Sequence, residues 1–140
     1  MDNQTASAYG IPQEWEDRLS FLRDLKPGWL EGEGREISRD AINRAGSFLA
    51  ELYRRGTERG GVFPTEEGGV SIEWVSDDGS ASVGIEFCPN GEVQMISFNG
   101  ATAVDDFLFF EYSEGYSGVY DSFVSHLEDV GIGLEALNAM

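Results

Sequence analysis

Carboxylates are the side chains of this sequence whose number and spacing could support chemistry. The chain holds 26 acidic residues in 140, and two neighbouring acids can hold Mg²⁺ or serve as the acid and base of a glycosidase. At this density adjacent pairs arise by chance, and Asp77-Asp78-Gly79 is also a typical turn sequence. We therefore expect no enzyme, and a carboxylate-based metal-dependent enzyme is the alternative. Its candidate residues are Asp77, Asp78, Asp105, Asp106, Glu111 and Glu114.

Other residue types used in catalysis are scarce. His126 is the only histidine and Cys88 the only cysteine, so a zinc site would lack ligands. His126 precedes Leu127 on an amphipathic turn, and we expect it at the surface. The sequence contains neither a phosphate-binding GxxxxGK[ST] loop nor a dinucleotide-binding glycine pattern between a strand and a helix. It therefore predicts no cofactor and no resident metal.

The acidic residues are distributed unevenly along the chain. The net charge is −17, and every Lys and Arg lies at or before Arg59. Residues 1–59 hold 9 basic and 11 acidic residues, whereas residues 60–140 hold 15 acidic residues and no basic residue. A surface this negative repels nucleic acid and anionic membranes and attracts basic partners. The alternative is that the acidity only keeps the protein soluble.

A first helix is expected at about residues 12–25. Pro12 suits its first position, and apolar residues recur at helical spacing at Trp15, Leu19 and Leu22. The glycine-rich loop at residues 29–34 carries two glutamates that could bind a cation. Glycines at this density are also typical of ordinary turns.

A second helix is expected after Ser38, which is a suitable N-cap, and before Gly56. Its arginines could contact nucleic acid, but a solvated face with internal ion pairs to the sheet is the favoured interpretation. The stripe that we expect to be buried comprises Ile42, Ala45, Leu49, Leu52 and Tyr53.

Between residues 62 and 98 the hydrophobic pattern changes to period two. Asp78-Gly79 and Asn90-Gly91 lie between the alternating runs, where hairpins turn. Residues 63–65 are expected as an edge strand, because proline cannot donate to a central ladder. Further strands are expected at 92–98 and at 106–112, although the second pattern also fits a short helix. The strand residues that we expect to be buried are Val70, Ile72, Trp74, Val83, Ile85 and Phe87.

The order of elements predicts an α+β fold. It comprises two N-terminal helices, an antiparallel β-meander of four to five strands, and one C-terminal helix, at about residues 119–130, packed on the sheet. We expect residues 1–140 to form a single domain, with a flexible terminus at 1–10 and a terminus at 131–140 that packs or frays. The sequence shows no signal peptide and no apolar run long enough to span a membrane. A single cysteine suits a reducing cytoplasm.

Three segments together resemble a known pattern. The chain from about residue 22 to residue 98 resembles a set of small bacterial and phage proteins with GW-x-GEG and PT-x-(E/D)GG-x-x-x-EW segments. This resemblance brings no established activity, and it implies an association with phage–host or toxin–antitoxin conflict. By their chemistry the matched residues are structural: turn glycines, a core tryptophan and an edge proline. They are Gly28-Trp29 with Gly32-Glu33-Gly34, Pro64-Thr65 with Glu67-Gly68-Gly69, and Ile72-Glu73-Trp74.

The leading hypothesis is a small, acidic, non-enzymatic inhibitor of anti-CRISPR or antitoxin type. Its partner would be a basic nucleic-acid-handling protein, such as a CRISPR effector, a nuclease or a toxin, bound in part by mimicry of nucleic acid. No direct contact with nucleic acid or membrane is expected. A further alternative is an oligomeric accessory protein whose aromatic residues between Phe107 and Tyr120 form an interface. The predicted partner-binding residues are Glu73, Asp77, Asp78, Glu86, Glu92, Asp105, Asp106, Glu111 and Glu114.

Overall fold

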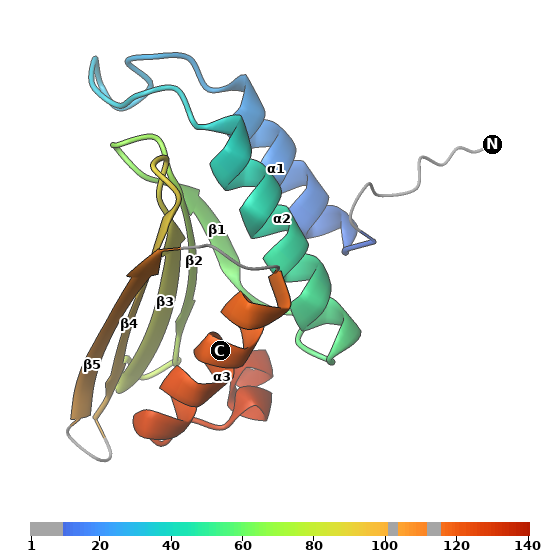
Figure 1. The fold of residues 1–140 in the computed structure, drawn as a ribbon, viewed down its shortest axis with the longest axis vertical. Coiled ribbons are helices and arrows are strands. Elements are labelled where there is room, and N and C mark those ends of the chain that lie inside the picture. The colour runs from blue at the N-terminus through green and yellow to red at the C-terminus, as the bar shows by residue number, and fades with distance from the viewer. Residues whose placement is uncertain (1–9, 101–103, 112–115) are drawn as a thin grey trace.

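Helices and one antiparallel sheet make this an α+β fold, as predicted (Figure 1). The computed structural model describes residues 10–100, 104–111 and 116–140, with the backbone alone for 104–111, 116 and 117. No helix in this part of the chain has the length and apolar character needed to cross a membrane. The elements in chain order are α1 (Gln13–Asp24), α2 (Arg39–Arg54), β1 (Gly61–Pro64), β2 (Val70–Val75), β3 (Ala81–Phe87), β4 (Glu92–Asn99), β5 (Val104–Glu111), α3 (Tyr116–Asp129) and the 3-10 helix η1 (Leu134–Ala139).

The five strands lie side by side in the order in which they occur in the chain, and each pairs antiparallel with the next. In the β2–β3 hairpin Ile72 pairs with Ile85 and Trp74 with Val83, so the apolar residues of both strands share one face. All six strand residues that were expected to be buried are buried. The fifth strand begins at Val104, before the predicted start, and the predicted Tyr112 lies outside the described residues.

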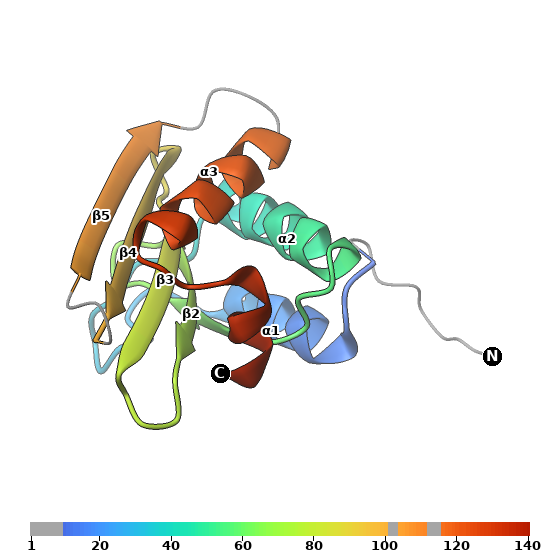
Figure 2. The ribbon, with the colours of Figure 1, turned by 90° about the horizontal axis from the view of Figure 1, so that it is seen from below.

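The three α-helices lie on the same side of the sheet (Figure 2). Phe48 of α2 packs against Phe87 of β3 and Phe123 of α3, with ring centroids 5.6 and 5.2 Å apart. Trp74 of β2 lies 5.5 Å from Phe123. Burying a side chain such as phenylalanine stabilises the fold by about 1.5–3 kcal/mol. This aromatic cluster therefore holds α2 and α3 over one face of the sheet.

The start of α2 agrees with the prediction, whereas one residue of its buried stripe does not. The Oγ atom of Ser38 accepts a hydrogen bond from the backbone N–H of Ala41 at 3.2 Å, as expected of an N-cap. Tyr53 is 39% exposed, so its predicted burial is wrong. The buried face of α2 also includes Ala41 and Phe48, and this shifts its centre away from Tyr53.

The arginines of α2 differ in their surroundings. Arg44 is buried; its Nε donates to Asp40 at 2.9 Å and its Nη2 donates to the backbone carbonyl of Cys88, at the end of β3, at 2.7 Å. Arg55 is exposed and donates from Nε to Glu51 at 2.8 Å. Both carboxylates belong to α2, so the prediction of ion pairs to the sheet is wrong for these two arginines.

The outer edge of β1 is covered by α1. Arg18 donates from Nε and Nη2 to the carbonyl oxygen of Val62 at 3.0 and 2.8 Å. Its guanidinium group lies 4.7 Å from the ring centroid of Phe21 and 5.9 Å from that of Phe63. Free carbonyls on an edge strand are a template for pairing with another chain. Arg18 therefore protects this edge.

The C-terminal segment packs against the fold. Ile132 and Leu137 are buried, and Asn138 holds the connection between α2 and β1. The Oδ1 atom of Asn138 accepts from the backbone N–H of Glu58 at 2.9 Å, and its Nδ2 donates to the carbonyl of Gly56 at 2.8 Å. Of the two alternatives expected for residues 131–140, the structure shows packing. Residues 1–9 lie outside the described residues.

Candidate functional site

One face of the sheet carries no helix in the described part of the chain, and we call it the open face (Figure 2). Because side chains alternate along a strand, the residues between the buried ones lie on this face. Four apolar side chains are exposed on it: Phe63 by 42%, Val75 by 53%, Ile96 by 56% and Phe98 by 39%. Apolar side chains gathered on one surface are typical of an interaction site. The other open-face residues of β2, β3 and β4 are Ser71, Glu73, Ser82, Gly84, Glu86, Glu92 and Gln94.

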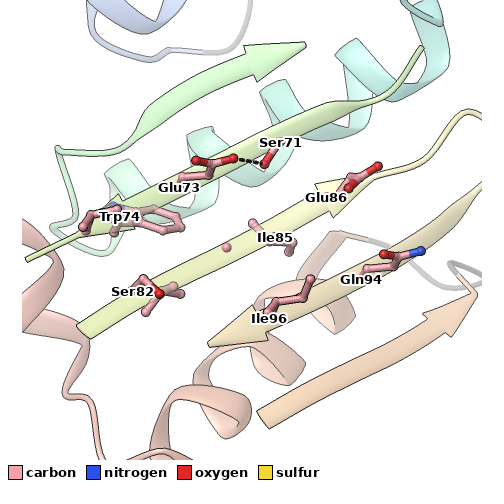
Figure 3. Close-up of a pocket in the computed structure, with 11 residues that line it drawn as sticks. Ser71, Glu73, Trp74, Ser82, Ile85, Glu86, Gln94 and Ile96 are labelled. Carbon is pink, nitrogen blue, oxygen red and sulfur yellow. Dashed lines mark hydrogen bonds between the residues drawn. The ribbon is translucent and has the colours of Figure 1, made fainter. Parts of the chain in front are cut away.

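A hollow of about 250 Å³ lies in the open face (Figure 3). It arises at Gly84, which has no side chain and pairs with Glu73 of β2 and Ile96 of β4. Ser82 and Glu86 lie on either side of Gly84 along β3 (Figure 3). A Cβ atom added to Gly84 would lie 3.6 Å from its nearest neighbour, which is ordinary van der Waals contact. Glycine is therefore not required for the backbone here, and its effect is to leave the hollow open.

Two carboxylates flank this hollow, and no arginine or lysine is among the residues that line it. Glu73 accepts a hydrogen bond from the Oγ of Ser71 at 2.8 Å. Burial raises the pKa of Glu86, and the charges of Glu67 and Glu73 raise it further, while a contact with the Cys88 thiol partly offsets the rise. Burial and the two neighbouring charges thus disfavour the ionised form of Glu86, whereas the thiol contact favours it. A cation in the hollow would therefore be stabilised by both glutamates.

The turn acids of the predicted site lie away from this hollow. Asp78, in the β2–β3 turn, accepts hydrogen bonds from the Oγ of Ser76 at 2.9 Å and from the Oγ and backbone N–H of Ser80 at 2.7 and 3.0 Å. These hydrogen bonds, chiefly those from Ser80, lower the pKa of Asp78 to about 2. Asp77 is exposed in the same turn, and Glu92 lines a neighbouring hollow at the start of β4. The structure therefore assigns Asp78 to the turn.

The predicted second acidic patch falls on or beside β5. The backbone places three of its members in β5, next to β4, but their side chains lie outside the described residues, as does the whole of Glu114. In the backbone register Asp105 pairs with Phe98, Asp106 with Ser97, and Glu111 with Glu92.

His126 lies in the core, so the prediction that it is at the surface is wrong. It is 1% exposed, and its Nε2 atom lies 2.7 Å from the Oγ of Ser97. The residue lies three positions after Phe123, on the face of α3 that packs on the sheet. Cys88 is also buried, and burial raises the pKa of its thiol to about 11. Within the described ranges, no group of three or more His, Cys, Asp or Glu residues could hold a metal ion.

The glycine-containing segments that carry the resemblance lie next to each other and are structural. The Nε1 of Trp29 donates to the carbonyl of Arg35 at 2.7 Å, and a Cβ atom on Gly34 would lie 2.7 Å from the Trp29 ring. A Cβ atom on Gly68 would lie 2.8 Å from the carbonyl oxygen of Glu36. Both glycines also have positive φ angles, 94° and 98°. A larger residue at Gly68 would therefore separate the two segments, whereas one at Gly34 would displace the Trp29 ring within its own segment.

The hollow and the exposed apolar residues around it were not predicted from the sequence. Gly84 was a signal for the hollow, because glycine inside a strand often marks the close approach of another group. Val75, Ile96 and Phe98 carried no equivalent signal. Val75 belongs to β2 and the other two to β4, and the register of the sheet brings them to one face.

Comparison of the chain with protein-family models, with curated proteins and with solved structures finds no match.

Proposed function

We propose that this protein is a non-enzymatic inhibitor that binds a basic, nucleic-acid-handling protein through the open face of its sheet. A CRISPR effector, a nuclease and a toxin are partners of this kind. The observation that carries the proposal is that the open face, which no helix covers in the described ranges, combines exposed apolar side chains with Glu73 and Glu86 beside a hollow without a basic lining residue.

The charge distribution supports a basic partner. All residues of β1 to β4 belong to the part of the chain after Arg59, which holds 15 acidic residues and no Lys or Arg. Sites that hold nucleic-acid phosphates are built from Lys and Arg, whose N–H groups also bind carboxylates. A carboxylate-bearing surface can therefore occupy such a site and compete with nucleic acid.

The apolar residues support a protein partner rather than small counterions. Phe63, Val75, Ile96 and Phe98 together expose apolar surface that gains from burial against another protein. Protein interfaces combine an apolar centre with polar and charged groups around it. The open face has both components, whereas a surface that served solubility alone would have no reason to expose these four side chains.

The proposal is tested by charge reversal on the open face. The protein is immobilised and exposed to bacterial lysate at low salt, and retained proteins are eluted with salt or with competing DNA and identified by mass spectrometry. The test variant is Glu73→Lys/Glu86→Lys. The matched control is Glu128→Lys/Asp129→Lys, which changes the net charge equally at exposed positions of α3.

We expect a basic nucleic-acid-binding protein to be retained by the wild type and the control, displaced by DNA, and lost from the open-face variant. Equal retention by the open-face variant, or the absence of any salt-sensitive partner, would overturn the proposal and reduce the acidity to a solubility effect.

A further inference from the structure

Three neighbouring hollows of the described chain lie at the open face and at its margins. The hollow at Gly84 shares Glu73, Trp74 and Val75 with a hollow of about 690 Å³ near the start of β1, and it shares Glu86 and Gln94 with one of about 450 Å³ beside the β3–β4 turn. Because each end hollow has lining residues in common with the central one, the three hollows adjoin one another. We call these three hollows the open-face groove.

Carboxylates occur along the whole groove. Glu73 and Glu86 lie in the central hollow, Glu14 and Glu58 in the hollow near β1, and Glu67 and Glu92 in the hollow beside the β3–β4 turn. Arg59 and Arg35 each line one of the two end hollows. Carboxylates thus outnumber guanidinium groups in every part of the groove, which suits a ligand with several positive charges in a row.

The spacing of the central carboxylates fits an extended chain. Glu73 pairs directly with Gly84, and Glu86 lies two residues beyond Gly84 on β3, so the two glutamates are diagonal neighbours (Figure 3). Diagonal neighbours on a sheet are about 7–8 Å apart, and alternate residues of an extended chain are about 6.6 Å apart. Lys or Arg at alternate positions of an extended segment can therefore reach both carboxylates.

The walls of the central hollow fit the apolar part of such side chains. Val75 and Ile96, both exposed on the open face, line it together with the glutamates. Lys and Arg place their apolar stems along such surfaces while the charged end meets a carboxylate. An α-helix is about 10–12 Å across with its side chains, so a whole helix cannot enter a hollow whose volume is about 250 Å³. A single side chain of an extended segment can enter it.

Resting on the proposed function, we infer that the open-face groove holds an extended segment of the partner with Lys or Arg at alternate positions, one of which enters the hollow at Gly84. Basic arms of this kind bind nucleic acid in many proteins. When the groove binds such an arm, the arm is no longer available to bind nucleic acid.

The experiment uses two fluorescent peptides of about nine residues, one with Arg and Ser in alternation and one with the same composition but the arginines in one block. Binding is measured by fluorescence anisotropy over a range of salt concentrations. The test variant Gly84→Val fills the hollow without changing the charge, and its thermal melting is compared with that of the wild type. Ile96→Lys, at an exposed position opposite Gly84, is a second test variant that places a cation beside the hollow.

We expect the alternating peptide to bind more tightly than the blocked peptide, and both variants to weaken its binding at least roughly tenfold. The control Glu128→Gln/Asp129→Asn should leave binding within about twofold. Equal binding of the two peptides, or unchanged binding to folded Gly84→Val and Ile96→Lys, would overturn the inference. If the peptide experiment overturned the inference but partner capture still depended on Glu73 and Glu86, the proposed function would stand without the inference. If partner capture were also independent of Glu73 and Glu86, the proposed function and the inference would both be wrong.

Discussion

The Nε2 atom of His126 in α3 lies 2.7 Å from the Oγ of Ser97 in β4, and both side chains are almost completely buried. Two residues further along β4, Asn99 donates from Nδ2 to the carbonyl of Val130 at 2.7 Å. The inward positions of β4 are thus polar where the strand passes under α3. Directional hydrogen bonds set the position of this helix on the sheet, in addition to apolar contacts such as that of Phe123.

Removing the hydroxyl of Ser97 should destabilise the protein. Ser97→Ala leaves the buried Nε2 of His126 without this partner, at a cost of about 1–2 kcal/mol in the free energy of unfolding. Urea denaturation measures the change. Ser97→Ala/His126→Leu, which removes both polar partners, should be less destabilised than the sum of the two single variants. Additive effects would show that the two side chains do not interact.

Gly68 is required for two reasons that can be separated. Gly68→Ala forces a side chain into a φ of 98° and places its Cβ 2.8 Å from the carbonyl oxygen of Glu36. Gly56 has the same φ, 98°, but a Cβ there has no neighbour within 4 Å. We expect Gly56→Ala to cost about 1 kcal/mol from backbone strain alone. Gly68→Ala should cost more, by about 1–3 kcal/mol, as measured by thermal or urea denaturation.

The pH dependence of the free energy of unfolding should show how far the ionised carboxylate of Glu86 destabilises the folded protein. Its pKa in the folded protein is raised above the usual 4.5, first by burial and then by the charges of Glu67 and Glu73. Between the two pKa values the folded state binds more protons than the unfolded state, so stability falls as pH rises through this window. Glu86→Gln carries no charge at this position, so it should be more stable than the wild type at pH values above the folded-state pKa of Glu86.

The difference between Glu86→Gln and the wild type should vanish below about pH 4, where both states of the wild type are protonated. Urea denaturation from about pH 3 to about pH 8 checks this. A variant that is equally or less stable than the wild type at neutral pH would show that the ionised carboxylate is compensated in the folded protein.

Arg18 should protect the β1 edge from association. Arg18→Met keeps much of the apolar stem but removes both donors to the Val62 carbonyl. We expect a loss of about 1–2 kcal/mol in stability, together with concentration-dependent self-association through the uncovered edge. Sedimentation velocity measures the association. Arg23→Met, an exposed position on the same helix, is the matched control and should remain unchanged in mass.

The elements of the fold could largely be predicted, because their signals are local. Alternation over residues 70–74 and 83–87 indicated two strands and their buried faces, and Ser38 indicated the start of α2. A strand has only two faces, so the pattern along one segment decides which residues are inside. Turn residues such as Asp78 could be assigned to the turn for the same reason.

The candidate site depended on contacts between segments. Glu73 and Glu86 were predicted as binding residues, but their position as diagonal neighbours beside Gly84 follows from the register of β2 on β3. Burial of His126 follows from the face that α3 presents to β4. A local pattern names the residues that can lie inside or outside, whereas pairing between strands and packing of helices decide which of them meet. The sequence by itself therefore determined the strands, the helices and the charge, and the tertiary structure alone decided that acidic and apolar residues share one uncovered face.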